Sequence, residues 1–246
     1  MKAMILAAGL GTRLRPLTDQ CPKALVEIDG RPMLEITLSR LRTFGVSDVV
    51  INTFHFPELI ETYLREKNNF GINIKVILEG TLLDTGGGLK NAAHFFQQSA
   101  DDDEPFIVHN VDVLSTIDLQ RIIEVHKKNH ALATLAVQDR KTSRRLLFDD
   151  RLSLCGRRSD NNAAELVANK QPSYELAFSG IHIISPRLLS MLTEEGAFSI
   201  IDSHLRLASE GEKIMAFRAD EYYWRDLGKP ESVAQASEDL RRGKLA

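Results

Sequence analysis

The residues best placed to do chemistry lie near the N-terminus, in the stretch MILAAGLGTRLRPLTDQCPKAL at residues 4–25. A short apolar run is followed by Gly9 and Gly11, and then by a segment that carries Arg13 and Lys23. Glycines let a backbone approach an anionic ligand, and backbone amides can donate to phosphate oxygens. An arginine fork and a lysine ammonium suit the dispersal of charge over transferring and leaving phosphates. The stretch therefore predicts a binding site for a triphosphate.

Two familiar phosphate-binding motifs do not fit this stretch. A Walker A loop ends in Gly-Lys-Ser or Gly-Lys-Thr, which the stretch lacks. The dinucleotide fingerprint shares the first two glycines, but its third glycine is missing. In addition, Pro16 and Pro22 would break the long helix that must hold the pyrophosphate. The pattern therefore disfavours NAD binding and a dehydrogenase, and it favours an extended, proline-stiffened loop.

The segment GLGTRLRPLTDQCPKAL at residues 9–25 resembles the signature Gly-x-Gly-x-Arg followed by Pro-Lys-x-Leu of the sugar-1-phosphate nucleotidyltransferases, which make nucleotide diphosphate sugars. Three further segments are similar to landmarks of that family, so the resemblance extends over nearly the whole chain. It implies a Rossmann-like fold and a reaction between a nucleoside triphosphate and a sugar 1-phosphate. The three segments are LLDTGGGLKNA at residues 82–92 (second nucleotide loop), IVHNVDVL at 107–114 (Asn-Gly-Asp metal strand) and WRDLGKPES at 224–232 (second metal aspartate).

The resemblance also implies a metal ion. Nucleotidyl transfer is an in-line attack on the α-phosphorus, and it needs Mg²⁺ to bridge phosphate oxygens. Mg²⁺ takes few protein carboxylates because it keeps much of its water. An aspartate after a strand is by itself more often a turn residue or a helix cap, but the resemblance at Asp112 and Asp226 favours ligands. The catalytic residues implied are Arg13, Lys23, Asp112 and Asp226, with Mg²⁺ on Asp112 and Asp226.

The nucleotide is expected along the first glycine loop and against the segment DTGGG at residues 84–88. That segment also fits a tight turn in which Asp84 or Thr85 caps the next helix. In the functional interpretation its glycines let the base and ribose lie against the backbone, with Glu79 near the base edge. The nucleotide-binding residues expected are Ala8, Gly9, Gly11, Thr12, Arg13, Glu79, Gly86 and Gly87.

The sugar side of the site departs from the family pattern. Val111 stands where the family commonly has Gly, and Ser143 or Arg144 replaces the glycine that usually begins the sugar-reading strand. The family's Glu-Lys-Pro element is not clear in residues 163–172, where Glu165 and Lys170 are candidates. Arg144 either reads an acidic or unusual sugar or is an ordinary surface residue. The residues expected to bind the sugar phosphate are Asn110, Arg144, Glu165 and Gly180.

These residues need a sheet that brings the ends of several strands together. Short β-rich runs alternate with amphipathic helical patterns, which predicts an α/β fold: a Rossmann-like mixed, mainly parallel sheet with helices on both faces. Ligands bind such sheets at the carboxyl ends of the strands. The strands expected are 3–8, 48–52, 74–78, 105–109, 133–138, 145–148, 177–184 and 214–218, and the helices 32–44, 57–66, 88–97, 118–129, 199–209 and 230–242.

Length and charge limit the kind of protein. The 246 residues, of which 43% are hydrophobic, predict a single domain over 1–246, with an antiparallel, sugar-binding excursion around 132–184. A net charge of -3 argues against nucleic acid as a partner. There is no apolar run of about 18 residues, so no membrane partner is expected. Two cysteines are too few for a disulfide framework, which fits a cytoplasmic protein. His126 and His130 are expected on a solvated helix face.

Several alternatives stay open at this point. The branches that look most similar are the small bacterial N-acetylmuramate-1-phosphate uridylyltransferases and mannose-1-phosphate guanylyltransferases, and the sequence does not separate them. A non-catalytic, nucleotide-sugar-binding regulatory subunit of the same fold is the alternative from another class. The presence of Arg13, Lys23, Asp112 and Asp226 together disfavours it, because a binding module needs no complete metal and leaving-group set. The assembly expected is a monomer or a homodimer.

Overall fold

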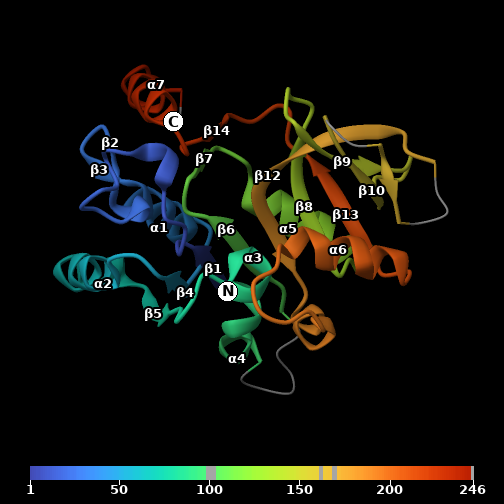
Figure 1. Ribbon diagram of the computed structural model, residues 1–246, viewed down its shortest axis with the longest axis horizontal. Helices are drawn as coiled ribbons and strands as arrows, with labels where there is room; N and C mark the ends of the chain where they lie inside the picture. The colour runs from blue at the N-terminus through green and yellow to red at the C-terminus, as the bar shows by residue number, and fades with distance from the viewer. Residues whose placement is uncertain (98–103, 161–162, 168–170, 245–246) are drawn as a thin grey trace.

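The central sheet organises the whole molecule (Figure 1). A computed structural model describes residues 1–97, 104–160, 163–167 and 171–244. In these residues the sheet has ten strands, eight of them in the order β11-β10-β9-β12-β6-β1-β4-β5, with β8 beside β12 and β13 beside β8. Helices cover both of its faces, so the predicted mixed α/β sheet is confirmed.

The N-terminal half of the sheet is parallel. β1 pairs with β4 and β6, and β4 pairs with β5. These pairs are parallel because helical connections carry the chain back to the end of the sheet at which the previous strand began. The β1 side chains Ala3, Met4 and Ile5 are fully buried, as expected for a strand covered on both faces. The elements are β1 (Lys2–Leu6), α1 (Met33–Thr43), β4 (Asp48–Thr53), α2 (Pro57–Glu66), β5 (Asn73–Leu78), α3 (Asp84–Asn91), α4 (Ala93–Phe96) and β6 (Phe106–Asn110).

Two apolar cores lie on the two faces of the sheet, because successive strand residues point to opposite sides. Ile5 belongs to one core, which contains Leu38 of α1, whereas Met4 belongs to the other, which contains Leu89 of α3. The described residues include no helix that is long and apolar enough to cross a membrane. The later helices divide in the same way, with α5 (Leu119–Asn129) and α7 (Pro230–Arg241) in the first core and α6 (Ile200–Ser209) in the second.

The C-terminal half of the sheet is mostly antiparallel. The long strand β12 pairs antiparallel with β6, β8 and β9, and β10 extends this arrangement from β9. Strand β13 then adds in parallel to β8. The strands are β8 (Ala133–Gln138), β9 (Arg144–Phe148), β10 (Leu154–Ser159), β11 (Glu165–Leu166), β12 (Tyr174–Ile184) and β13 (Ile214–Arg218).

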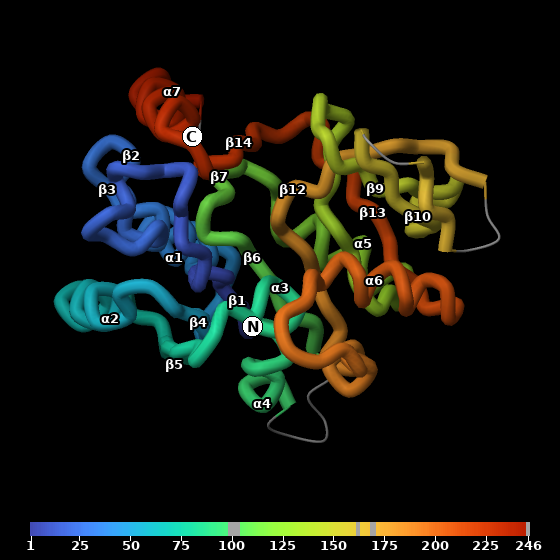
Figure 2. Tube along the Cα trace, in the orientation of Figure 1, coloured from blue at the N-terminus to red at the C-terminus, as the bar shows by residue number. Residues whose placement is uncertain are grey.

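The C-terminal segment returns to the N-terminal half, as the chain trace shows (Figure 2). Strand β14 (Trp224–Asp226) pairs antiparallel with β7 (Val113–Ser115), which follows β6 directly. Helix α7 then lies beside the hairpin of β2 (Glu27–Ile28) and β3 (Arg31–Pro32), where Asp29 N donates to Ser237 Oγ at 3.2 Å. The short 3₁₀ turns are η1 (Thr12–Leu14), η2 (Lys23–Leu25), η3 (Asn68–Gly71) and η4 (Pro186–Met191).

Three expectations were wrong in detail. The helix expected at 88–97 begins at Asp84, so the three glycines lie inside α3 and not in a turn before it. The expected strands included neither β10 nor β11, because pairing of β10 with β9 and of β11 with β10 stabilises strands whose own composition does not predict them. His126 is buried and not solvated, since its ring nitrogens lie 3.0 Å from the hydroxyls of Thr134 and Ser185.

Candidate active site

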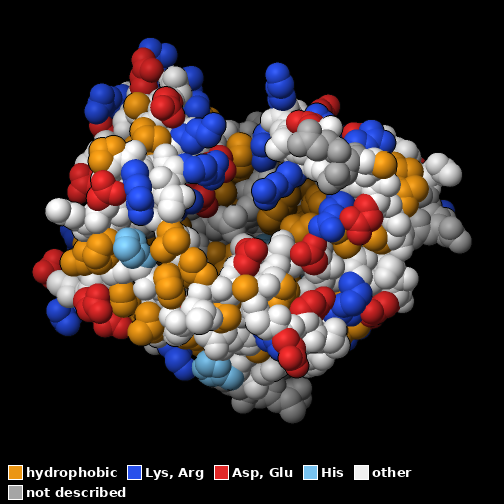
Figure 3. Space-filling model, viewed as in Figure 1, with side chains coloured by type: hydrophobic (Ala, Val, Ile, Leu, Met, Phe, Trp, Pro, Cys, Tyr) orange, Lys and Arg blue, Asp and Glu red, His pale blue; other side chains and the backbone are white. Residues whose placement is uncertain are grey.

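Two cavities open at the carboxyl ends of the central strands. The N-terminal cavity, of about 470 Å³, is lined by the loop after β1 and by the start of α3. The C-terminal cavity, of about 730 Å³, is lined by β9, β10, β12 and β14 and forms part of the hollow seen on the surface (Figure 3). Asn110 and Asp112 line both cavities. The two cavities therefore share a wall at the end of β6.

The pairing of β7 with β14 brings the two predicted metal aspartates together. Asp112 directly precedes β7, and Asp226 is opposite Val113 in the register of the two strands. The carbonyl oxygen of Asp112 also accepts a hydrogen bond from the amide of Leu227 at 2.8 Å. Among the described residues there is no group of three or more His, Cys, Asp or Glu side chains that could hold a metal. The carboxylates available at this junction are therefore those of this pair.

The two predicted cations lie at the same junction. The ammonium of Lys23 forms an ion pair with Asp112, and the side chains are only 13% and 16% exposed. The guanidinium of Arg13 lies beside Gly228, where a Cβ atom would be 2.5 Å from Arg13 Nη2 and 2.7 Å from Asp226 Oδ1. The amide of Gly228 donates to Asp226 Oδ1 at 2.6 Å. The structure thus brings together all four residues expected to be catalytic.

Gly228 was missed by the sequence reasoning, although it lies in the quoted segment WRDLGKPES. Its role depends on Arg13, which is far away in the chain, so the local sequence gives no sign of the close approach. Glycine permits that approach because it has no Cβ.

The first glycine loop shapes the N-terminal cavity. Gly11 has φ +64°, and a Cβ there would lie 2.9 Å from Thr18 Cγ2 and 3.1 Å from Lys23 Cβ. The loop can therefore fold onto Lys23 only with glycine at this position. Gly9 differs, because no atom lies within 4 Å of its Cβ position and it faces open space. The loop residues that line this cavity are Ala8, Gly9, Leu10, Gly11 and Thr12.

Glu79 lies in the wall of the N-terminal cavity and is 2% exposed. Its Oε1 accepts from Asn52 Nδ2 at 2.7 Å, and its Oε2 accepts from the amide of Leu83 at 3.1 Å. Asn52 Oδ1 in turn accepts from the amide of Ala7 at 2.8 Å. The carboxylate therefore joins β1, β4 and the start of α3, and its contact with a base stays a prediction.

Gly86 and Gly87 lie inside α3 and line neither cavity. A Cβ on Gly86 would be 2.3 Å from Phe198 Cε2, and one on Gly87 would be 2.5 Å from the carbonyl oxygen of Gly196. The amide of Gly86 donates to the carbonyl of Phe198 at 2.9 Å. These glycines let α3 pack against the segment before α6. Their predicted contact with the base and ribose is not tested by this packing.

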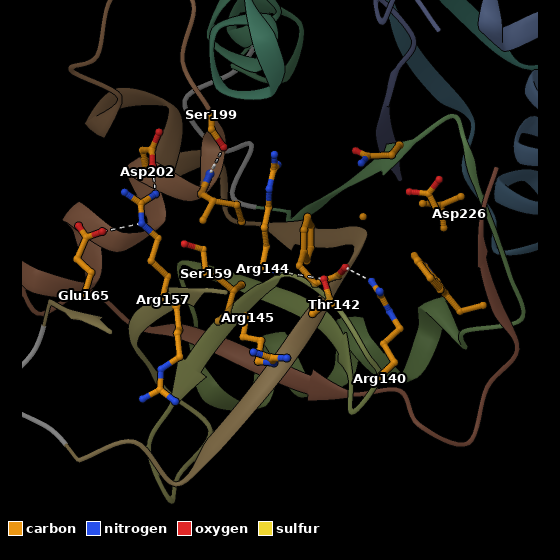
Figure 4. A pocket seen from close by; sticks show the side chains of 18 of the residues that line it. Arg140, Thr142, Arg144, Arg145, Arg157, Ser159, Glu165, Ser199, Asp202 and Asp226 are labelled. Carbon is orange, nitrogen blue, oxygen red and sulfur yellow. Dashed lines mark hydrogen bonds and ion pairs between the residues drawn. The ribbon is translucent and has the colours of Figure 1, made fainter. Parts of the chain in front are cut away.

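The C-terminal cavity is lined by all four residues expected to bind the sugar phosphate. Arg144 and Glu165 are labelled in Figure 4. Gly180 has φ +73° and lies within the register shift of β12 against β8, and a Cβ there would lie 2.7 Å from Val113 Cγ2, so glycine suits both this backbone conformation and the close approach of β7. Lys170, the further candidate, lies outside the described residues. The four residues are Asn110, Arg144, Glu165 and Gly180.

Arg140 and Trp224 form part of the cavity wall and were not predicted. The Arg140 guanidinium lies 3.7 Å from the centroid of the Trp224 ring, and its Nη2 donates to the carbonyl of Phe178 at 2.7 Å. Burial lowers the pKa of Arg140, and the charge of nearby Asp226 opposes that shift. A fixed cation thus lies beside the second aspartate. The composition of the loop before β9 gives no indication of this, because Trp224 comes from a distant strand.

Three buried histidines lie behind the site. Burial lowers the pKa of His109 to about 4 and that of His204 to about 3, and it also lowers the pKa of His182. His182 Nδ1 and His204 Nε2 are 3.3 Å apart. At neutral pH these rings are uncharged and belong to the core.

A model of the nucleotidyl transferase family matches residues 2–146, which is more than half of the chain. The chain belongs to the nucleotidyl transferase family. Enzymes of this family generally use a divalent metal ion. The matched segment includes the first glycine loop, Lys23 and Asp112, whereas Asp226 and most of the C-terminal cavity lie beyond it.

Curated relatives extend the similarity over the whole chain. An N-acetylmuramate alpha-1-phosphate uridylyltransferase of Caulobacter vibrioides is 30% identical over 251 residues, which covers 97% of this chain and 96% of that protein. A UTP–glucose-1-phosphate uridylyltransferase of Synechocystis sp. is 31% identical and covers 96% of this chain, but only 62% of that protein is matched. The chain spans about three fifths of the length of several relatives that it matches, including mannose-1-phosphate guanylyltransferases.

Solved structures confirm the fold. A UDP-glucose pyrophosphorylase complexed with UDP-glucose has a TM-score of 0.80 at 18% identity, with 98% of each chain covered. The inositol-1-phosphate CTP transferase from T. maritima has a TM-score of 0.77 at 16% identity, covering 98% of this chain and 96% of that one. The common feature is the nucleotide-diphospho-sugar transferase fold.

Proposed function

We propose that this protein is a sugar-1-phosphate nucleotidyltransferase that makes a nucleotide diphosphate sugar and pyrophosphate, with residues 1–246 as its single domain. The observation that carries the proposal is the meeting of two cavities at Asp112, with Asp226, Lys23 and Arg13 at the junction. A transferase needs two substrates with their reacting atoms side by side, which two cavities that share a wall provide.

In this proposal the N-terminal cavity binds the nucleoside triphosphate. The loop from Gly9 to Thr12 would lie against the phosphates, where the open space at Gly9 admits an oxygen to the backbone. The base would extend toward Glu79, Asp84 and Thr85 at the other side of the cavity. The ion pair of Lys23 with Asp112 keeps an ammonium at the inner end, where the pyrophosphate would leave.

The sugar 1-phosphate would enter the C-terminal cavity and present its phosphate oxygen beside Asn110. That oxygen is already an anionic nucleophile, so no covalent intermediate on the protein is required. The oxygen attacks the α-phosphorus, and the bond to the leaving pyrophosphate breaks on the opposite side. Arg13 and Lys23 neutralise charge on the transferred and leaving groups, and the protein contributes positioning and electrostatics.

The donor set fits Mg²⁺. Asp112 and Asp226 supply carboxylates from two adjacent strands, and Mg²⁺ is typically held by one or two carboxylates together with substrate phosphates. Asp112 and Asp226 would hold the ion, which would neutralise part of the charge on the phosphates. The amide of Gly228 holds Asp226 Oδ1, and the pairing of β7 with β14 fixes the spacing of the two aspartates.

Pyrophosphate release in the presence of Mg²⁺ tests the proposal. The assay pairs UTP, GTP, CTP, ATP and dTTP with the 1-phosphates of mannose, glucose, N-acetylglucosamine, N-acetylmuramate and heptose. We expect turnover with at least one pair, with GTP and mannose 1-phosphate or UTP and N-acetylmuramate 1-phosphate as the first to examine. Folded protein that binds a nucleotide and releases no pyrophosphate with any pair would support a regulatory subunit instead.

A further inference from the structure

The C-terminal cavity has more cationic side chains than one phosphate group needs. Five arginines line it, from the loop before β9 and from β9 and β10. We propose that the cavity accepts a sugar 1-phosphate that bears a carboxylate, and that Arg144 binds this carboxylate. The inference rests on the proposed function and names its acceptor class. The five residues are Arg140, Arg144, Arg145, Arg157 and Arg158.

Three of the five arginines are already paired with carboxylates. Their charges are balanced by carboxylates of the protein, so these arginines do not require an anionic ligand. They still contribute to the electrostatic potential in the cavity. The pairs are Arg145 with Asp160 at 3.2 Å, Arg157 with Glu165 at 2.7 Å and with Asp202, and Arg158 with Glu175.

Arg140 is placed for the 1-phosphate. Its stacking on Trp224 and its hydrogen bond to Phe178 fix the guanidinium beside Asp226. The acceptor phosphate must come to the Asp112 and Asp226 end of the cavity, because the attack occurs there. The 1-phosphate of the acceptor is therefore the anionic group that binds Arg140.

Arg144 has no comparable partner. Within the described residues its guanidinium makes no hydrogen bond and no ion pair, and its backbone amide donates to Thr142 Oγ1 at 3.2 Å. The side chain is exposed and extends into the cavity from the first residue of β9 (Figure 4). A neutral sugar would leave this cation without a counter-charge, whereas a planar carboxylate matches its fork in two parallel hydrogen bonds.

Matched acceptor pairs test the inference once the preferred nucleotide is known. The pairs are glucose and glucuronate 1-phosphates, galactose and galacturonate 1-phosphates, and N-acetylglucosamine and N-acetylmuramate 1-phosphates, with glucose 1,6-bisphosphate as a further acceptor. We expect kcat/KM to be about tenfold or more higher for a carboxylated member, chiefly through KM, because a charge-assisted hydrogen bond forms in the bound state. Arg144→Gln should reduce that ratio about tenfold by raising KM for the acidic sugar.

Two further variants separate binding from bulk charge. Arg144→Lys should keep part of the preference, because a point charge still attracts the carboxylate but lacks the fork. Arg65→Gln removes an exposed arginine of α2 that lines neither cavity, and it should keep the full preference.

Equal or better use of the neutral partners, or an unchanged ratio in Arg144→Gln, would overturn the inference and leave the proposed function intact. A preference for the bisphosphate over every carboxylated acceptor would overturn it in favour of a second phosphate. Absence of turnover with every acceptor would overturn the proposed function and this inference together.

Discussion

Gly228→Ala should separate activity from stability, because the atoms that the new methyl group would meet belong to the predicted site. The Cβ would lie 2.5 Å from Arg13 Nη2 and 2.7 Å from Asp226 Oδ1, both nearer than ordinary contact. Both atoms are at the ends of side chains and can move away, so the free energy of unfolding should fall by only about 1 kcal/mol, the low end for overpacking. That corresponds to about 2–4 °C in Tm for a chain of this size.

The effect on turnover should be much larger. Relief of the two contacts requires the carboxylate and the guanidinium to shift by several tenths of an ångström or more. A misplacement of about 1 Å can cost on the order of 10²-fold in rate. We therefore expect kcat to fall about 10- to 100-fold in the pyrophosphate-release assay, with a smaller change in KM for the nucleotide.

Gly80→Ala is the matched control. No atom lies within 4 Å of the Cβ position of Gly80, and its φ is not in the left-handed region. This variant should keep both the wild-type kcat and the wild-type Tm. Wild-type kcat in Gly228→Ala would refute the assignment of Arg13 and Asp226 to the reacting centre.

Lys23→Met should lower kcat about 10²–10³-fold, as for the loss of one electrostatic contact, and a rate within twofold of wild type in the same assay would contradict the role of Lys23. Gly86→Ala should lower the free energy of unfolding by about 1–3 kcal/mol, because its Cβ would lie 2.3 Å from Phe198 Cε2. A thermal melt that matches that of the wild type would show that stability does not depend on this packing. His126 has a pKa lowered by burial from 6.5 to about 4, so the unfolded chain binds more protons between these values, and stability should decline as the pH falls from about 6.5 to 4. His126→Asn should reduce the slope of Tm against pH in this range, with His109, His182 and His204 contributing the rest, and an unchanged slope would contradict the contribution of His126.

Much of the fold could be predicted because local patterns determine it. The continuous apolar run of β1 and the helical spacing in α2 gave elements within a few residues of those observed. The strands β10 and β11 could not be predicted, because their residues form strands only when a neighbouring strand supplies the hydrogen-bonding partner, β9 for β10 and β10 for β11. His126 was assigned to solvent for a similar reason, since its partners Thr134 and Ser185 come from other elements.

Part of the candidate site could likewise be predicted from the sequence, and part depends on the tertiary structure. Residue types and spacing within one segment predicted the glycine loop and Lys23, whereas Asp112 and Asp226 were predicted from the resemblance of their segments to landmarks of the family. Only the tertiary structure placed Asp226 opposite Val113 and Arg13 against Gly228, since β14 returns to β7 from the far end of the chain. It also decided which arginines of the C-terminal cavity are paired, because their carboxylate partners lie on other strands and on α6. The sequence by itself determined which chemical groups are present, and the long-range strand pairing decided which of them meet and which charges are left for a ligand.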